Sequence, residues 1–137
     1  METDEWRVAP PMNVSRYFHM CNTINDKTTG NQIVVVVGGV NDLDGKDVTL
    51  KSTEIFDGIN WRMGPDLPKP MCCGQLVSTV DSAKLLWVGG GDIVESRQEM
   101  SNDIYELSEN LDEWIKMPFT LTTGRSFFAA VDAPSLC

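Results

Sequence analysis

The chain repeats itself with a period of about fifty residues, and this feature constrains the fold more than any other. Trp6, Trp61 and Trp114 are separated by 55 and 53 residues, and the paired glycines that begin at Gly38 and Gly89 lie 51 residues apart. Each tryptophan opens a similar segment, in which an apolar or basic residue is followed within a few positions by proline. Periods of this length indicate a repeat architecture, in which each unit buries its apolar surface against the next.

Each period contains four short segments with the composition of β-strands, bounded by Gly, Pro, Asn or Asp. In the first period we expect strands near residues 17–23, 32–37, 52–57 and 60–63, and in the second near 74–80, 84–88, 102–107 and 113–117. We expect two further strands, around Trp6 and over 126–131, which would belong to neighbouring repeats. No stretch combines helix caps with an apolar stripe of period 3.6, so helices should be scarce.

Two of these segments are apolar without alternation and end in glycine, QIVVVVGG at 32–39 and LLWVGG at 85–90. A continuous apolar run of this length predicts a strand that is buried on both faces. The glycines that follow would let the chain turn where no side chain fits. The expected fold is therefore all-β, with four-stranded units packed face to face as in the blades of a propeller.

The order of these elements resembles the kelch repeat family. That family has a double glycine after the second strand, then a spaced aromatic residue, a tryptophan and a proline-rich segment, often with an arginine before the next repeat. The matching residues in the two repeats are Gly38, Gly39, Phe56 and Trp61, and then Gly89, Gly90, Tyr105 and Trp114. Two departures concern spacing and composition: the gap from aromatic residue to tryptophan is 5 in one repeat and 9 in the other, and PKPMCCG lacks the arginine that Arg16 and Arg125 supply elsewhere.

The resemblance implies a partial β-propeller of four-stranded antiparallel kelch blades. We expect residues 1–15 to hold the last strand and linker of a preceding blade, 16–63 the first repeat, 64–117 the second, and 118–137 a linker and the first strand of a following blade. Propellers of this family hold about six blades. The remainder of a larger propeller, or a self-associating copy of the chain, is accordingly one expected partner.

Composition narrows the classes of partner. Lys and Arg number 11 against 20 Asp and Glu, so the net charge of −9 disfavours binding to nucleic acid or to anionic membrane surfaces. The first ten residues, METDEWRVAP, have neither the basic start nor the apolar core of a signal peptide, and we expect a cytoplasmic protein. For the four cysteines, Cys21, Cys72, Cys73 and Cys137, free buried thiols are favoured over disulfides, and Cys72 and Cys73 should point to opposite faces of a strand.

Residue patterns for catalysis or metal binding are weak. The segment GGVNDLDGKD fails both the spacing of a phosphate-binding loop and the ligand positions of a calcium loop, and is better explained as a solvated hairpin loop. His19 is the only histidine, too few for a zinc or copper set, and no nucleophile has an evident His and acid beside it. We expect no cofactor, no metal and no enzymatic activity.

The remaining candidates are loop residues that could bind a protein or peptide. In kelch proteins that bind peptides, one face is built from the loops between second and third strands and from the linkers between blades. The candidates on those segments are Arg16, Asp42, Asp44, Lys46, Arg97, Gln98 and Arg125. The resemblance implies a non-catalytic interaction module, such as the substrate-recognition part of a cullin ubiquitin-ligase adaptor. The alternatives are a cytoskeleton-binding kelch protein, or a fragment of a kelch-propeller enzyme (an oxidase or sugar epimerase) whose site lies in other blades.

Overall fold

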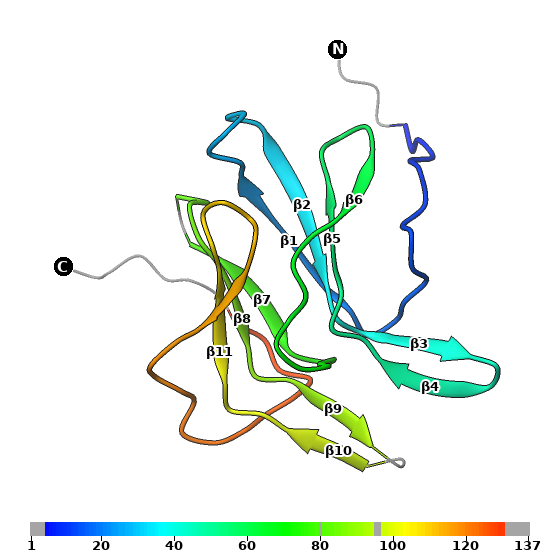
Figure 1. Cartoon of the computed structure of the whole chain (residues 1–137), viewed down its shortest axis with the longest axis vertical. Helices are drawn as coiled ribbons and strands as arrows, with labels where there is room; N and C mark the ends of the chain where they lie inside the picture. Colours follow the sequence, from blue (N-terminus) through cyan, green and yellow to red (C-terminus); the bar gives the residue numbers. More distant parts are fainter. Residues whose placement is uncertain (1–4, 80, 95–96, 131–137) are drawn as a thin grey trace.

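The computed structural model describes residues 5–79, 81–94 and 97–130, and its regular structure there is entirely β (Figure 1). Two four-stranded antiparallel sheets form the body of the molecule. Blade 1 has the strand order β1 (Met20–Asn25), β2 (Gln32–Val37), β5 (Thr53–Phe56) and β6 (Trp61–Met63). Blade 2 has the order β7 (Gln75–Ser78), β8 (Leu85–Val88), β11 (Ile104–Leu107) and β12 (Trp114–Lys116).

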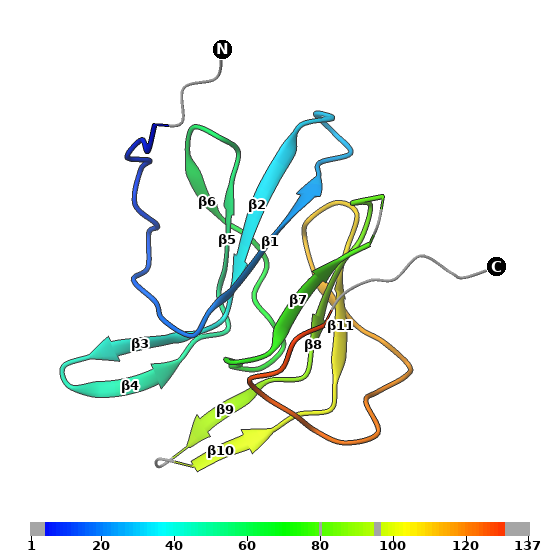
Figure 2. The same ribbon diagram turned by 180° about the vertical axis from the view of Figure 1, so that it is seen from behind.

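Both blades have the topology that the repeat predicted, and the fold class is confirmed as a partial propeller of four-stranded blades. All eight predicted strands of the two repeats are present, with ends shifted by up to three residues. Neighbouring strands within each blade are antiparallel throughout. The first strands of the two blades, β1 and β7, lie beside each other. Figure 2 shows the two sheets from behind, lying face to face.

Each repeat also contains a two-stranded hairpin. A hairpin loop was expected at the first of them, within GGVNDLDGKD, and only a loop at the second. β3 (Val40–Leu43) pairs with β4 (Lys46–Thr49), and β9 (Gly91–Val94) pairs with β10 (Arg97–Met100). Asp44 and Gly45 turn the first hairpin with φ of 54° and 78°. Positive φ at both central residues is the signature of the two-residue turn that Asp-Gly favours, and its twist matches that of the flanking strands.

The paired glycines lie where the chain leaves β2 and β8 for the two hairpins. Gly38 and Gly89 have φ of 60° and 64°, a left-handed conformation that other residues adopt only with strain. A Cβ atom on Gly38 would lie 2.2 Å from the carbonyl oxygen of Met71, and one on Gly89 would lie 2.8 Å from that of Arg125. The prediction that glycine is required here by a turn and by crowding is confirmed.

The alignment of the two repeats needs one correction. Val37 pairs with Thr53 and precedes Gly38, whereas Val88 pairs with Ile104 and precedes Gly89, so Thr53 corresponds to Ile104. The counterpart of Phe56 is therefore Leu107, and Tyr105 corresponds to Glu54. The sequence matched Phe56 with Tyr105 because both are aromatic. Of the apparent difference of four residues in spacing, two come from this mismatch and two from a longer loop before Trp114.

The core lies between the two blades. Val35, Val37 and Ile55 of blade 1 belong to one buried cluster with Leu85 and Trp87 of blade 2. Trp114 is 5% exposed in the same cluster, and its indole Nε1 donates to Thr53 Oγ1 at 3.0 Å. The expected burial on both faces holds for much of β2, where Val35, Val36 and Val37 are all buried. It does not hold for β8, in which Leu85 and Trp87 face the core while the alternating residues of the strand are only half-buried.

The tryptophans do not occupy three equivalent places. Trp61 and Trp114 open the last strands of their blades, but Trp6 is fully exposed and no strand forms around it. The strand expected over 126–131 is also absent from 126–130, and residue 131 lies outside the described residues. A strand needs a partner strand, and neither segment pairs with a strand of the described chain.

A short hydrogen-bond ladder joins successive repeats at their inner ends. Phe18, Cys73 and Phe127 all have positive φ, at 53°, 59° and 52°. The amide of Cys73 donates to the carbonyl of Phe18 at 3.2 Å, and the amide of Phe127 donates to the carbonyl of Cys73 at 2.9 Å. These three residues are therefore equivalent positions of three successive repeats. Arg16, Met71 and Arg125 precede them by two residues each, so the predicted starts at residues 16 and 64 are not equivalent.

No helix in the described part of the chain is long and apolar enough to cross a membrane.

Candidate protein-binding surface

The two hairpins project from the same end of the two blades and lie side by side (Figures 1 and 2). The amide of Ile93 on β9 donates to Thr49 Oγ1 on β4 at 3.1 Å, which joins one hairpin to the other. We call the surface formed by β3–β4, β9–β10 and the linkers at residues 13–17, 69–71 and 122–125 the hairpin end. The sequence-predicted loop candidates all fall on these segments.

The first hairpin carries three of the predicted residues, and all three are exposed. Asp42 Oδ1 accepts a hydrogen bond from the amide of Gly45 at 2.7 Å, so this carboxylate also holds the turn. Asp44 occupies the left-handed position of that turn, and Lys46 begins β4 opposite Leu43. Their charged groups reach solvent at the tip of the hairpin, where a partner could contact them.

Tyr17 and Asp47 are a contact that the sequence reasoning missed. The Tyr17 hydroxyl donates to Asp47 Oδ1, and this hydrogen bond raises the pKa of Tyr17 to about 12. Both residues are exposed. The pair ties the linker before blade 1 to the first hairpin, and the only signal in the sequence was the position of Tyr17 beside Arg16.

The second hairpin places Arg97 and Gln98 on β10, opposite Val94 and Ile93. The side chains of Arg97 and Gln98 lie outside the described residues, so their predicted contacts stay predictions. Glu99 and Met100 on the same strand are exposed. The sequence reasoning did not select Glu99 or Asp92, because an isolated acidic residue in a loop carries no distinctive signal.

A shallow pocket of about 190 Å³ lies at the base of the second hairpin. Its walls come from the linker between the blades and from β9 and β10, and the lining residues are Lys69, Pro70, Met71, Gly91, Asp92, Glu99, Met100 and Ser101. The pocket combines two carboxylates and the ammonium group of Lys69 with the apolar side chains of two methionines. It can accept a side chain that has a long apolar stem and a polar end.

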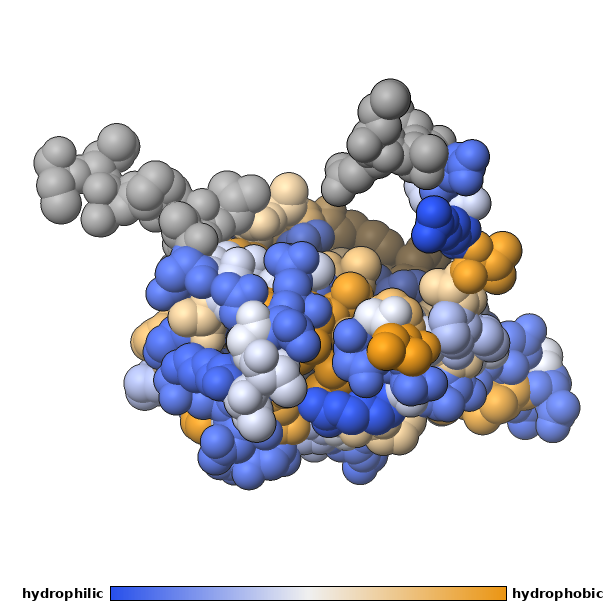
Figure 3. Space-filling view, turned by 90° about the horizontal axis from the view of Figure 1, so that it is seen from above, coloured by the Kyte–Doolittle hydropathy of each residue, from blue (hydrophilic) through white to orange (hydrophobic). Residues whose placement is uncertain are grey.

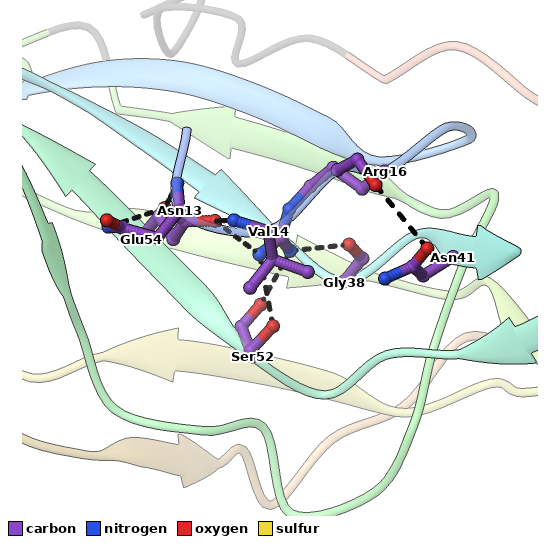
Figure 4. Close-up of polar contacts among 8 residues, drawn as sticks. Asn13, Val14, Arg16, Gly38, Asn41, Ser52 and Glu54 are labelled. Carbon is purple, nitrogen blue, oxygen red and sulfur yellow. Dashed lines mark hydrogen bonds and ion pairs between the residues drawn. The ribbon is translucent and has the colours of Figure 1, made fainter. Parts of the chain in front are cut away.

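Arg16 is not available for a ligand, contrary to its selection as a binding candidate. Its side chain is fully buried, and Nη2 lies 2.8 Å from Oε1 of Glu54, which is equally buried (Figure 4). Nη1 donates to the carbonyl oxygens of Gly38 and Ser52 at 2.8 and 3.0 Å. The guanidinium therefore fastens the linker to the double-glycine turn of blade 1, which is a structural role.

Glu54 is held as a carboxylate in this buried site. Burial alone would raise the pKa of Glu54, but hydrogen bonds from the amide of Asn13, from Arg16 and from the amide of Val14 outweigh it and lower the pKa below its ordinary value. The Asn13 amide lies 2.7 Å from Oε2. A buried carboxylate without these partners would lower the stability of the fold, so the burial of Glu54 depends on Arg16 and the burial of Arg16 depends on Glu54.

The second repeat replaces this ion pair with a different arrangement. Met71 occupies the place of Arg16, and Tyr105 that of Glu54, as the register shows. The ion pairs of the second repeat are formed instead by the carboxylate of Asp103, which lies 2.7 Å from Lys69 Nζ and 2.8 Å from Lys116 Nζ. Hydrogen bonds from Lys116 and Lys69 lower the pKa of Asp103 well below its ordinary range. The missing arginine of PKPMCCG is thereby explained.

Arg125 is the third member of this series, and its side chain is exposed. Its Nε donates to the carbonyl of Thr123 at 3.4 Å, and its guanidinium carbon lies 6.0 Å from the centre of the Phe128 ring. The acceptors that Arg16 finds in blade 1 would, for Arg125, belong to a blade that follows blade 2. Arg125 therefore remains a candidate cation at the hairpin end.

The opposite end of the molecule carries the loops β1–β2 and β5–β6 and is predominantly hydrophilic (Figure 3). A second hollow there is lined by Asp26, Asp57, Arg62 and Ile59 among others. Asp57 Oδ1 accepts the amides of Ile59 and Asn60, both at 2.8 Å, and these bonds lower the pKa of Asp57. These carboxylates stabilise their own turns, and none of the sequence-predicted binding residues lies at this end.

Known proteins resemble this chain in sequence and in structure. No protein-family model matches the chain. The human kelch repeat and BTB domain-containing protein 12 is 30% identical over 121 residues, which covers 81% of this chain and 18% of that protein. The rat Kelch-like protein 38 is 29% identical over 119 residues, which covers 85% of this chain and 18% of that protein. The chain thus spans about a fifth of the length of these relatives.

The solved structure of YjhT, a kelch-type propeller, matches with a TM-score of 0.62 at 14% identity, over 86% of this chain and 32% of that one. This likeness concerns the fold alone. The blade order, the double-glycine turns and the relatives agree: the chain belongs to the kelch repeat family.

Proposed function

We propose that the chain is a protein-interaction module that binds a polypeptide partner through the hairpin end and performs no chemistry of its own. The observation that supports this most is the pair of hairpins projecting side by side from one end of the blades. The exposed side chains at their tips contribute nothing to the core. Protein-binding loops are commonly carried on a rigid scaffold of this kind.

Charge favours a partner segment that contains Lys or Arg. The described acids of the hairpin end number five, Asp42, Asp44, Asp47, Asp92 and Glu99, against three described cations with exposed side chains, Lys46, Lys69 and Arg125. Because Arg16 is buried in its ion pair, the hairpin end offers fewer cations than the sequence suggested. Complementary charge steers association and selects partners, and its effect weakens as salt rises.

An acidic partner is the second candidate, supported by the exposed guanidinium of Arg125. A forked donor of this kind can bind a carboxylate through two hydrogen bonds. Arg125→Ala would then reduce affinity for an acidic peptide and leave affinity for a basic peptide unchanged. Unchanged binding of both peptides would assign Arg125 to structure.

Peptides of equal length and graded net charge, labelled for fluorescence anisotropy, test the proposal directly. We expect basic peptides to bind more tightly than acidic ones, and the double variant Asp42→Asn with Asp44→Asn to weaken that binding. Asparagine keeps the turn-forming acceptor and tolerates positive φ, so the hairpin should stay folded. The matched control is Asp57→Asn with Asp81→Asn, which removes the same charge from turns at the opposite end. Equal losses in both variants would contradict a site at the hairpin end.

We further propose that this module serves as the recognition part of a larger adaptor. The name of one relative combines kelch repeats with a BTB domain, and the chain spans 18% of that relative. An antibody raised against residues 91–100 tests this proposal on an immunoblot of the endogenous protein. A band far larger than 15.2 kDa supports it, and a single band near that mass contradicts it.

A further inference from the structure

Cys72 and Cys73 form a close pair of sulfur atoms immediately before β7. Both side chains are buried, with 0% and 1% exposed, and Cys73 Sγ donates to Cys72 Sγ at 3.3 Å. Adjacent residues of an extended strand would point to opposite faces, which was the expectation from the sequence. The positive φ of Cys73, 59°, breaks that alternation and turns both side chains to the same side.

The separation of the sulfur atoms brings them within reach of a covalent bond. Even apolar carbon atoms are most stable at about 3.5–4.0 Å, so 3.3 Å is a tight contact. A disulfide bond measures about 2.05 Å, and closure therefore requires a movement of little more than ~1 Å. Adjacent Cα atoms lie about 3.8 Å apart, below the usual range of 4.4–6.8 Å for disulfides, so the bond formed here would be strained and readily reduced.

Two phenylalanines flank the pair at the surface. Phe18 and Phe127 are the neighbours of Cys73 in the inter-repeat ladder, and their rings meet edge to face with centroids 5.7 Å apart. Their side chains are 49% and 67% exposed. The cysteine side chains themselves pack with Val40, which is fully buried, and with Ile93. A small oxidant therefore reaches the sulfur atoms when this packing opens locally.

We propose that Cys72 and Cys73 are a reversible redox pair that a hydroperoxide oxidises to a vicinal disulfide. One thiolate attacks the peroxide oxygen, the O–O bond breaks, and a sulfenic acid forms with release of one water from hydrogen peroxide. The second thiol attacks the sulfenic sulfur, the S–O bond breaks, and the disulfide forms with release of a second water. Two thiols are oxidised and one peroxide is reduced, so no other electron carrier is required.

The backbone contacts of the pair give oxidation a structural consequence. Cys72 and Gly91 exchange two backbone hydrogen bonds, at 2.7 and 3.0 Å, and Cys73 donates one to Phe18 and accepts one from Phe127. These bonds join the start of blade 2 to the second hairpin and to both neighbouring repeats. A disulfide between Cys72 and Cys73 closes a ring that contains the peptide bond joining the two residues, and this ring restrains the backbone torsions of both. Oxidation therefore shifts some of the backbone hydrogen bonds that these residues make. The redox pair itself does not depend on the proposed binding function.

The test uses the full chain carrying Cys21→Ser and Cys137→Ser, so that no other thiol can contribute. The folded, reduced protein is treated with hydrogen peroxide, blocked with N-ethylmaleimide and digested for mass spectrometry. We expect the peptide that contains both cysteines to lose two hydrogen atoms, to escape alkylation, and to regain both thiols with dithiothreitol. Further replacement of Cys73 by Ser should leave a sulfenic acid on Cys72 that dimedone traps.

Two results would overturn the proposal. One is full alkylation of both residues after peroxide treatment of the folded chain. The other is disulfide formation in guanidinium-unfolded chain at a rate equal to or greater than that in folded chain, because the folded geometry would then contribute nothing. If Cys73→Ser does not fold, the comparison between folded and unfolded chain still decides.

Discussion

Arg16 Nη2 and Glu54 Oε1 lie 2.8 Å apart with both side chains fully buried, and this ion pair joins the linker of the first repeat to the centre of blade 1. Glu54 also accepts the amides of Asn13 and Val14 at 2.7 and 3.1 Å. Removing one member leaves the other charge buried without its ionic partner. The stability of blade 1 should therefore depend on both residues together.

Replacing Arg16 by Met, the residue at this place in the second repeat, should lower the free energy of unfolding by about 3–5 kcal/mol. Chemical denaturation followed by tryptophan fluorescence measures the change. The double variant Arg16→Met with Glu54→Tyr introduces the second repeat's solution, and its loss should be smaller than the sum of the single losses. Additive losses would show that the pair is not coupled.

Stability should also fall in acid through Glu54. Because the folded state lowers the pKa of Glu54, its contribution is complete above its ordinary pKa of 4.5 and is lost as the pH falls through the lower folded value. Denaturation series from neutral pH to below that range should show a smaller dependence on pH in Glu54→Gln than in the unmodified chain. Asp103, whose pKa is also lowered, supplies part of the dependence that remains. Identical slopes in the two proteins would contradict this role of Glu54.

The double-glycine turn can be tested with a matched pair of substitutions. Gly38 and Gly30 both have positive φ, but a Cβ on Gly38 would lie 2.2 Å from the Met71 carbonyl, whereas one on Gly30 meets nothing within 4 Å. Gly30→Ala should cost about 1–2 kcal/mol through backbone strain alone. Gly38→Ala should cost clearly more in the same denaturation experiment. Equal costs would show that crowding at the blade centre does not matter.

The tryptophans offer a comparison between burial and exposure. Trp114→Ala should lower the free energy of unfolding by about 3–5 kcal/mol, because its ring is buried and its Nε1 bonds Thr53 across the blades. Trp6→Ala should leave stability unchanged, since that ring is fully exposed. Thermal unfolding by circular dichroism measures both. A large effect at Trp6 would restore the sequence-based expectation that all three tryptophans are equivalent.

The blades were predictable because their signals are regular and local. Spaced tryptophans, paired glycines and apolar runs such as QIVVVV identify strands that are buried between neighbours. The alignment of Phe56 with Tyr105 was wrong because aromatic character is a weaker constraint than the pairing of Val37 with Thr53 and of Val88 with Ile104. Residue spacing alone could not reveal the longer loop before Trp114.

The candidate surface was predictable only in part. Its loops were located correctly, because they follow from the order of strands in a kelch blade. The burial of Arg16 depends on Glu54, which lies 38 residues away, and no local pattern indicates such a contact. The convergence of Cys72 and Cys73 depends on one positive φ, which a residue pair without glycine does not suggest.

Peptide titration followed by amide NMR shows directly whether a partner binds at the hairpin end. The titration uses the peptide that binds most tightly among those of graded net charge. We expect the amide chemical shifts that change to cluster on β3–β4, β9–β10 and the linker at 69–71. Amides of the loops at 26–31 and 57–60, at the opposite end, should not move. Shift changes confined to those opposite loops, or spread evenly over both blades, would contradict the claim.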